Sequence, residues 1–204
     1  MLLYLTAEPF EYPRADWPHS VRMVGPGIWD PPADPPDWLE KVERPLVLVT
    51  CSTEFQNDGR LAAAALEALR DEPVEVVVTT AGVDPTAFAA PGNARVVRFL
   101  PHHTILHRVT CVVCHGGMGI TQKALAAGVP VCVVPFGRDQ TEVAQHVVAA
   151  RAGTRVPTAA LRPERLRSAV RMAVTLKPGA ERIARSFREA GGPAAAATVV
   201  EALL

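Results

Sequence analysis

His115-Gly116-Gly117 is the group of residues in this chain whose types and spacing most clearly suggest chemistry. It lies between an apolar run at residues 110–114 and a stretch at 120–127 with the composition of a helix. The first turn of a helix leaves backbone N–H groups unpaired and carries a partial positive charge, and glycine lets a ligand approach that backbone closely. The combination predicts a phosphate or diphosphate site, to which His115 could donate a hydrogen bond. A tight turn without a ligand is the simpler alternative.

Two better-known phosphate loops do not match this segment. Gln122 stands where the dinucleotide-binding pattern G-x-G-x-x-G needs its third glycine, and no Gly-Lys-Ser/Thr follows as in a P-loop. The sequence therefore gives no reason to expect a nicotinamide cofactor.

Six short, β-branched apolar runs must position this loop. Such runs suit parallel strands that are covered by helices on both sides. They are residues 46–51, 74–80, 94–100, 110–114, 129–135 and 153–157. Helices are expected between and after them, at residues 60–70, 104–108, 120–127, 142–152, 163–175, 180–190 and 194–204. The alternation predicts the α/β class, a Rossmann-like doubly wound parallel sheet of about six strands with helices on both faces, which binds ligands at the carboxyl ends of its strands.

Residues 1–45 contain many of the 19 prolines and are expected to be irregular, because proline blocks helices and central strands. This beginning suggests that an upstream portion is missing. We expect residues 1–24 to be the end of an N-terminal domain and its linker, and residues 25–204 to form the ligand-binding domain with its C-terminal helices.

Charge and hydropathy exclude some classes of partner. The 204 residues carry 21 basic and 21 acidic side chains, so no nucleic-acid or membrane-surface partner is expected. No apolar run is long enough for a signal peptide or a membrane span, and a cytoplasmic location is expected.

The four cysteines include a match to the haem-attachment pattern C-x-x-C-H, at Cys111, Cys114 and His115. On a strand, residues three apart point to opposite faces, so these two thiols could not easily hold one haem or one metal. Cys51 and Cys132 also lie in apolar runs. All four are expected to be buried, reduced thiols.

His103, His107 and His146 show no regular metal-ligand spacing with carboxylates or thiols. His103 and His107 lie four residues apart on a short expected helix, which could hold zinc in principle, but surface or packing roles are favoured. No metal and no other cofactor are expected.

Three segments carry a resemblance to a known family: "FLPHHTIL", "HGGMGITQKALAAGVPV" and "PFGRDQ". They resemble the half of GT-B glycosyltransferases that binds the sugar donor, and most of all the family-1 enzymes that glycosylate small natural products. The similarity runs from about residue 21 to about residue 155. Members of the family have two Rossmann-like domains with a cleft between them, and this chain resembles the C-terminal one.

The resemblance implies roles for particular residues. The diphosphate of a nucleotide-sugar is expected to contact His115, Gly116, Gly117, Gly119, Thr121, Ser52 and Thr53. The base is expected to stack on Phe99 and to contact Leu100 and His102, where His102 replaces the usual glutamine. The sugar hydroxyls are expected to bind Asp139 and Gln140, since a carboxylate and an amide could together bind a vicinal diol. Asp139 could also cap a helix in a capping box with Glu142.

Two residues depart from the pattern of the family. Ile120 stands where many relatives have Ser or Thr, so one hydroxyl contact to phosphate is absent. Lys123 stands where many have a Glu that accepts hydrogen bonds from ribose, and a cation cannot accept them. Lys123 could reach a phosphate instead, or the ribose could be held differently.

The resemblance implies an inverting glycosyltransferase that moves a sugar from a UDP- or TDP-sugar to a hydroxyl of a small-molecule acceptor. The general base and the acceptor site are expected on the missing N-terminal domain, so this chain holds no catalytic base. Two alternatives stay open, namely another GT-B enzyme such as a nucleotide-sugar epimerase, and a catalytically silent binding or helper module.

Overall fold

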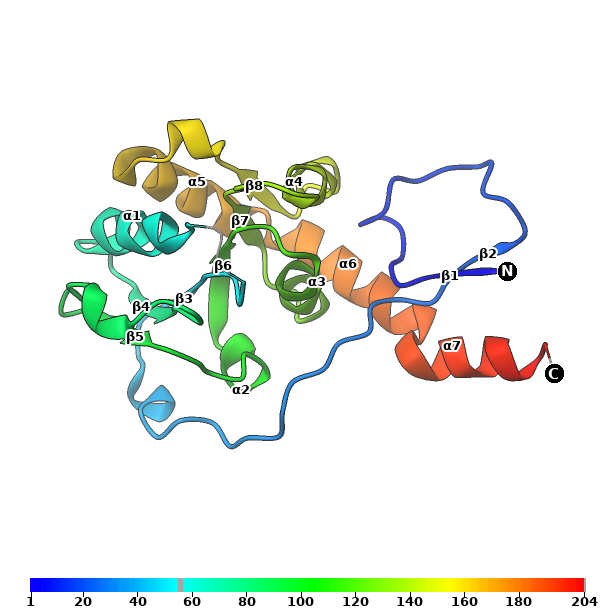
Figure 1. Ribbon diagram of the computed structural model, residues 1–204, viewed down its shortest axis with the longest axis horizontal. Coiled ribbons are helices and arrows are strands. Elements are labelled where there is room, and N and C mark those ends of the chain that lie inside the picture. Colours follow the sequence, from blue (N-terminus) through cyan, green and yellow to red (C-terminus); the bar gives the residue numbers. More distant parts are fainter. Residues whose placement is uncertain (55–56, 204) are drawn as a thin grey trace.

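The computed structural model describes residues 1–54 and 57–203, and a six-stranded parallel sheet lies at its centre (Figure 1). The strands follow the order β5-β4-β3-β6-β7-β8, and every neighbouring pair is parallel. They are β3 (Leu46–Thr50), β4 (Glu75–Thr79), β5 (Ala94–Val97), β6 (Val109–Cys114), β7 (Val131–Val133) and β8 (Gly153–Arg155). The chain runs outward in one direction from β3 and in the other from β6, so the strand order reverses between them. This is the doubly wound arrangement that the sequence predicts.

Helices cover both faces of the sheet. They are α1 (Gly59–Leu69), α2 (His103–Leu106), α3 (Met118–Ala126), α4 (Gln140–Ala149), α5 (Pro163–Thr175), α6 (Lys177–Ala190) and α7 (Gly192–Glu201), with short 3-10 turns at Leu39–Lys41, Pro85–Ala87 and Thr158–Ala160. All seven expected helices are found; Leu204, at the end of the last, lies outside the described residues. The helix α6 begins three residues earlier than expected, because Pro178 is tolerated in its first turn.

Alternation along the strands produces two apolar cores. In β3, Val47 and Val49 pack with α1 and α5, whereas Leu46 and Leu48 pack on the opposite face with α2, α3, α4 and α6 (Figure 1). Successive residues of a strand point to opposite faces, and helices cover both faces of this sheet. The near-continuous apolar runs of the sequence follow from this double coverage.

The cysteines confirm the prediction of buried, free thiols. Cys111 lies in the core on the α1 and α5 side, and Cys114 lies in the core on the α3 side. Burial raises the pKa of Cys114 to about 11 and that of Cys132 to about 12, so these thiols stay protonated. The match to the haem pattern is therefore accidental.

The expectation that residues 1–45 are irregular is wrong in two places. Strand β1 (Leu2–Tyr4) pairs in parallel with β2 (Val21–Met23), because the prolines lie between these short runs and not within them. The loop that joins the strands packs on the main domain: Phe10 is 1% exposed, and its carbonyl oxygen lies 3.0 Å from Nδ1 of His146. The domain boundary after residue 24 remains a prediction.

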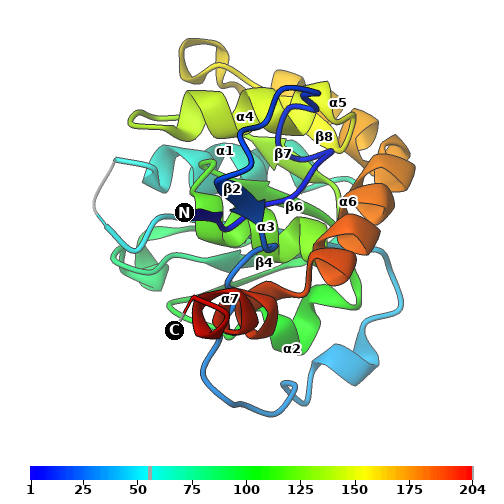
Figure 2. The ribbon, with the colours of Figure 1, turned by 90° about the vertical axis from the view of Figure 1, so that its right-hand side faces the viewer.

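Helix α7 and the β1–β2 pair lie at the same side of the domain, where both ends of the chain are found (Figures 1 and 2). None of the residues of α7 is buried. Of the described helices, none has the length and apolar character to cross a membrane.

Candidate functional site

An open cavity of about 510 Å³ lies at the carboxyl edge of the sheet, at the switch point between β3 and β6. Open α/β sheets bind their ligands at this position. The walls come from the residues after β3, β4 and β5, from His115 after β6, from the first turns of α3, and from linker residues 27–31. Of the predicted site residues, eight line it: Ser52, Thr53, Phe99, Leu100, His102, His115, Gly117 and Gly119.

His115 ends β6 and faces the cavity with a mostly buried ring, 8% exposed. Its Nδ1 is buried and has no hydrogen-bond partner within residues 1–54 and 57–203. Burial lowers the pKa of His115, and the carboxylates of Asp58 and Asp139 and a contact with the backbone of Thr50 oppose this effect without overcoming it. The ring lines the cavity and is neutral, so one of its nitrogens carries a hydrogen that can be donated to a polar ligand there.

The three glycines of this loop have different reasons to be glycine. Gly116 has φ +92°, and a Cβ there would lie 2.7 Å from Cγ1 of Val133. A Cβ on Gly117 would lie 2.5 Å from Nε2 of His115, so the bare backbone makes room for the ring. Gly119 faces open space. Gly116 allows the turn, Gly117 leaves space for the ring of His115, and Gly119 leaves the cavity side of α3 open.

Ser52 and Thr53 follow β3 at the other side of the switch point. The backbone N–H of Ser52 donates to Oδ2 of the buried Asp58, and its Oγ accepts from the N–H of Glu54. These bonds fix the turn after β3 beside the loop that carries His115.

Thr121 and Gln140, both expected to touch the ligand, lie outside the cavity lining. Thr121 is fully buried, and its hydroxyl donates to the carbonyl oxygen of Gly117 at 2.9 Å. Gln140 is 2% exposed, and its Oε1 accepts from the N–H groups of Phe136 and Gly137 at 2.7 and 3.1 Å. In this structure both side chains hold loops in place.

Asp139 is exposed and precedes α4, but its side chain makes no capping hydrogen bond. The capping box with Glu142 therefore does not form. Gly116 also lies outside the lining, since its backbone turns behind the loop toward Val133 and Gln140.

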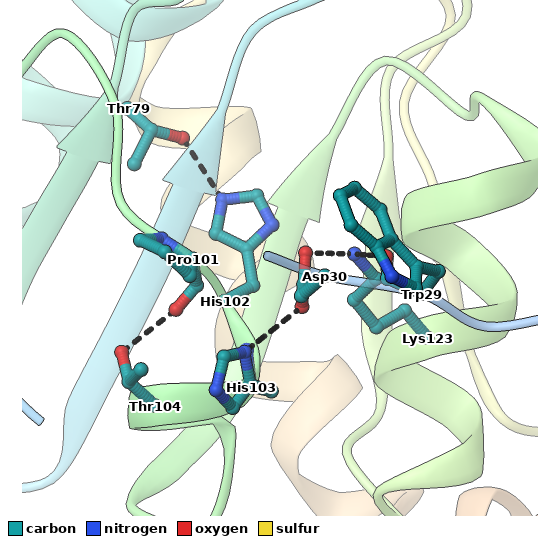
Figure 3. Close-up of polar contacts among 8 residues, drawn as sticks. All are labelled: Trp29, Asp30, Thr79, Pro101, His102, His103, Thr104 and Lys123. Atoms are coloured by element: carbon teal, nitrogen blue, oxygen red, sulfur yellow. Dashed lines mark hydrogen bonds and ion pairs between the residues drawn. The ribbon is translucent and has the colours of Figure 1, made fainter. Parts of the chain in front are cut away.

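The opposite wall of the cavity carries Phe99, Leu100 and His102. Phe99 is 65% exposed, so it is not part of the core and the face of its ring is open to a ligand. Nε2 of His102 lies 3.2 Å from Oγ1 of Thr79 (Figure 3). Burial lowers the pKa of His102 to about 4, with a further contribution from Lys123, so this side chain is neutral at neutral pH.

An ion pair that sequence reasoning missed closes the linker side of the cavity. Nζ of Lys123, on α3, lies 2.5 Å from Oδ1 of Asp30 in the linker (Figure 3). The residues are 93 positions apart, and no spacing in the sequence relates them. The only signal was Lys123 itself, an unexpected cation in a predicted nucleotide site.

A doubly wound parallel sheet with a cavity at its switch point and a His-Gly-Gly loop on its rim defines a Rossmann-like domain. The family model described as the erythromycin biosynthesis protein CIII-like C-terminal domain matches residues 63–203. The chain belongs to this family of glycosyltransferase C-terminal domains.

Similar proteins agree with this assignment. The 4'-demethylrebeccamycin synthase of Lentzea aerocolonigenes is 41% identical over 83% of this chain and 41% of its own length. A PGL/p-HBAD biosynthesis glycosyltransferase of Mycobacterium tuberculosis is 35% identical over 89% of this chain and 42% of its own. Among solved structures, the calicheamicin glycosyltransferase CalG4 is 28% identical with a TM-score of 0.82, covering 98% of this chain and 51% of that one.

The chain covers only part of the length of each of these relatives. It spans about two fifths of the curated relatives and about half of the solved glycosyltransferases. VinC, solved in complex with dTDP, gives the same picture, with 27% identity, a TM-score of 0.73 and 50% of that chain covered. The fold is that of one half of a GT-B glycosyltransferase, as the sequence predicts.

Proposed function

We propose that this chain binds the sugar donor for an inverting glycosyltransferase that moves a sugar from a UDP- or TDP-sugar to a hydroxyl of a small molecule. The observation that carries the proposal is the position of His115 in the lining of the switch-point cavity, beside the open N-terminus of α3. The solved relative VinC is in complex with dTDP, which supports a nucleoside diphosphate as the ligand.

In this proposal the diphosphate lies over the first turn of α3. Backbone N–H groups at Met118 and Gly119 have no intrahelical acceptor in a first turn, and they would donate to phosphate oxygens together with His115. As the bond from the anomeric carbon to the leaving oxygen breaks, negative charge grows on the diphosphate. The helix terminus and His115 would stabilise that charge where a metal acts in other enzymes, and we propose no cofactor.

The base would contact the exposed ring of Phe99 and the backbone near Leu100, at the wall that also carries His102. Asp139 is the side chain that we propose for the sugar hydroxyls. It is exposed on the loop after β7, and it lies near enough to His115 to influence the pKa of that ring. Gln140 would act by holding this loop.

The displacement also needs a base that removes a proton from the acceptor hydroxyl. We propose that this base and the acceptor site belong to a further domain, since the relatives are about twice the length of this chain. The names of the similar proteins favour sugar transfer over the epimerase and over the silent module.

Calorimetric titration of the chain with UDP, TDP and GDP tests the proposal. We expect one diphosphate to bind, and His115→Ala to weaken it by roughly tenfold or more, the value of a charge-assisted hydrogen bond. His107→Ala is the matched control, because His107 is exposed at the end of α2 and does not line the cavity. A folded wild-type chain that binds none of the three at millimolar concentration would refute the proposal.

A further inference from the structure

The cavity presents one carboxylate to its ligand. Among the described residues that line it, Asp30 carries the only acidic side chain, whereas Arg98 and Lys123 are basic. Asp30 comes from the linker between β2 and β3, which crosses the carboxyl edge of the sheet at residues 27–31. Its side chain is 12% exposed, so the carboxylate is held at the wall and does not extend into solvent.

Two hydrogen bonds fix the carboxylate from different elements (Figure 3). Lys123 on α3 donates to Oδ1 at 2.5 Å, and the backbone N–H of His103 at the start of α2 donates to Oδ2 at 3.1 Å. Lys123 also donates to the carbonyl oxygen of Trp29 at 3.2 Å. Burial alone would raise the pKa of Asp30, but the bonds from Lys123 and His103 outweigh it and hold the pKa below its ordinary value.

The ion pair makes a carboxylate compatible with an anionic ligand. An unpaired Asp30 would repel a diphosphate across a partly desolvated cavity, whereas the pair with Lys123 adds no net charge. A carboxylate accepts about four hydrogen bonds, so Asp30 keeps acceptor capacity beyond its two fixed donors. The pair therefore presents acceptor oxygens without an excess of negative charge.

The two ends of a nucleoside diphosphate need opposite partners. Its phosphates require hydrogen-bond donors, which the loop of His115 and the first turn of α3 provide. Its ribose hydroxyls donate and require acceptors. Asp30 reaches the cavity from the linker, so its carboxylate is separate from the donors of the first turn of α3 and can serve as such an acceptor.

We propose that Asp30 accepts a hydrogen bond from a ribose hydroxyl of the nucleotide, and that Lys123 is the positioning residue that holds it there. This inference rests on the proposed function and deepens it, because it makes the linker part of the sugar-donor site. The cation on α3 does not contact the ribose itself; it fixes a carboxylate delivered by a segment 93 residues away.

Hydroxyl-deleted nucleotides test the contact directly in the whole chain. We compare the affinities of UDP and 2′,3′-dideoxyuridine diphosphate, and of TDP and its 3′-deoxy analogue, by calorimetry. In the wild type, we expect the deletion to weaken binding by roughly tenfold to a hundredfold, the range for a hydrogen bond to a charged group. In Asp30→Ala we expect parent and analogue to bind equally.

Matched variants separate this contact from a general loss of structure. Asp34→Ala changes an exposed carboxylate of the same linker and should keep the wild-type ratio of the two affinities. Lys123→Met should reduce the ratio, because the carboxylate loses its main support, and Lys123→Arg should preserve it. If Asp30→Ala does not fold, Asp30→Ala/Lys123→Met leaves neither charge unpaired, and it too should bind parent and analogue equally.

The outcomes test the role of Asp30 separately from the proposed function. A wild type that binds neither nucleotide refutes the proposed function itself. If the wild type binds the nucleotide and its hydroxyl-deleted analogue with equal affinity, the role of Asp30 is refuted and the proposed function stands. The same conclusion follows if the alanine variant keeps the wild-type ratio.

Discussion

The loop after β6 and the loop after β7 both carry residues of a family motif, yet they use them differently. The loop after β6 leaves Nδ1 of His115 without a partner within the described part of the chain and opens Gly119 to the cavity. The loop after β7 turns Gln140 inward, where its carboxamide oxygen binds the backbone of its own loop. Polar residues at the carboxyl edge of a sheet can thus contact a ligand or support the loop that does.

The largest effect that would test this difference is expected within the first loop, at Gly116→Ala. Alanine at φ +92° costs about 1–2 kcal/mol, and its Cβ would overlap Val133 at a cost of about 1–3 kcal/mol. We expect urea unfolding to show a loss of roughly 2–5 kcal/mol. Gly119→Ala, which meets open space, should leave stability nearly unchanged. Equal losses would show that the two glycines do not differ as the geometry indicates.

The next largest effect is the pH dependence of stability that His102 causes. This residue lines the cavity, and its ring forms a hydrogen bond with Thr79. Its pKa is about 4 in the folded chain, whereas a solvated histidine has a pKa of 6.5. Between these values the unfolded chain binds the extra proton, so stability falls as pH falls from 6.5 to 4, by up to about 3 kcal/mol. Denaturant unfolding of the wild type and His102→Gln across this range measures the effect. The glutamine variant should lose less stability, and parallel curves would contradict the assignment.

Gln140→Leu should have a smaller effect, on the stability of the second loop. The change removes the acceptor for the N–H groups of Phe136 and Gly137, and we expect a loss of about 1–3 kcal/mol. Gly137 is exposed, so its N–H can donate to water instead, and the loss is expected at the lower end of this range. Unchanged unfolding with a large loss of nucleotide-sugar affinity would mean that Gln140 contacts the ligand after all.

The smallest effect on stability is expected at Asp139→Asn, because this side chain is exposed and caps nothing. The unfolding midpoint should stay at the wild-type value. In the proposed function the variant should bind a free nucleoside diphosphate as the wild type does, and it should bind the corresponding nucleotide-sugar a few-fold more weakly. Calorimetry with both ligands measures this difference, and a shifted midpoint would reveal a structural role.

The sequence predicted the sheet and its helices because their signals are local. Runs such as residues 46–51 are short, β-branched and apolar on both faces, a pattern typical of a strand that is covered on both sides. The proline-rich beginning misled that reasoning, since the pairing of β1 with β2 depends on residues 19 positions apart that carry little pattern of their own. Phe10, buried among residues of α4 and α6, gave no local signal either.

The sequence alone determined which chemical groups follow which strands: a His-Gly-Gly turn after one buried strand and an aromatic residue near the end of another. It also determined the family to which this chain belongs. Which of those groups reach the cavity was decided by the tertiary structure. Thr121 and Gln140 face inward, where they bond backbone groups of their own loops, and Asp30 reaches Lys123 because the linker crosses the edge of the sheet. Such pairings depend on contacts between distant segments, and residue type and spacing do not encode them locally.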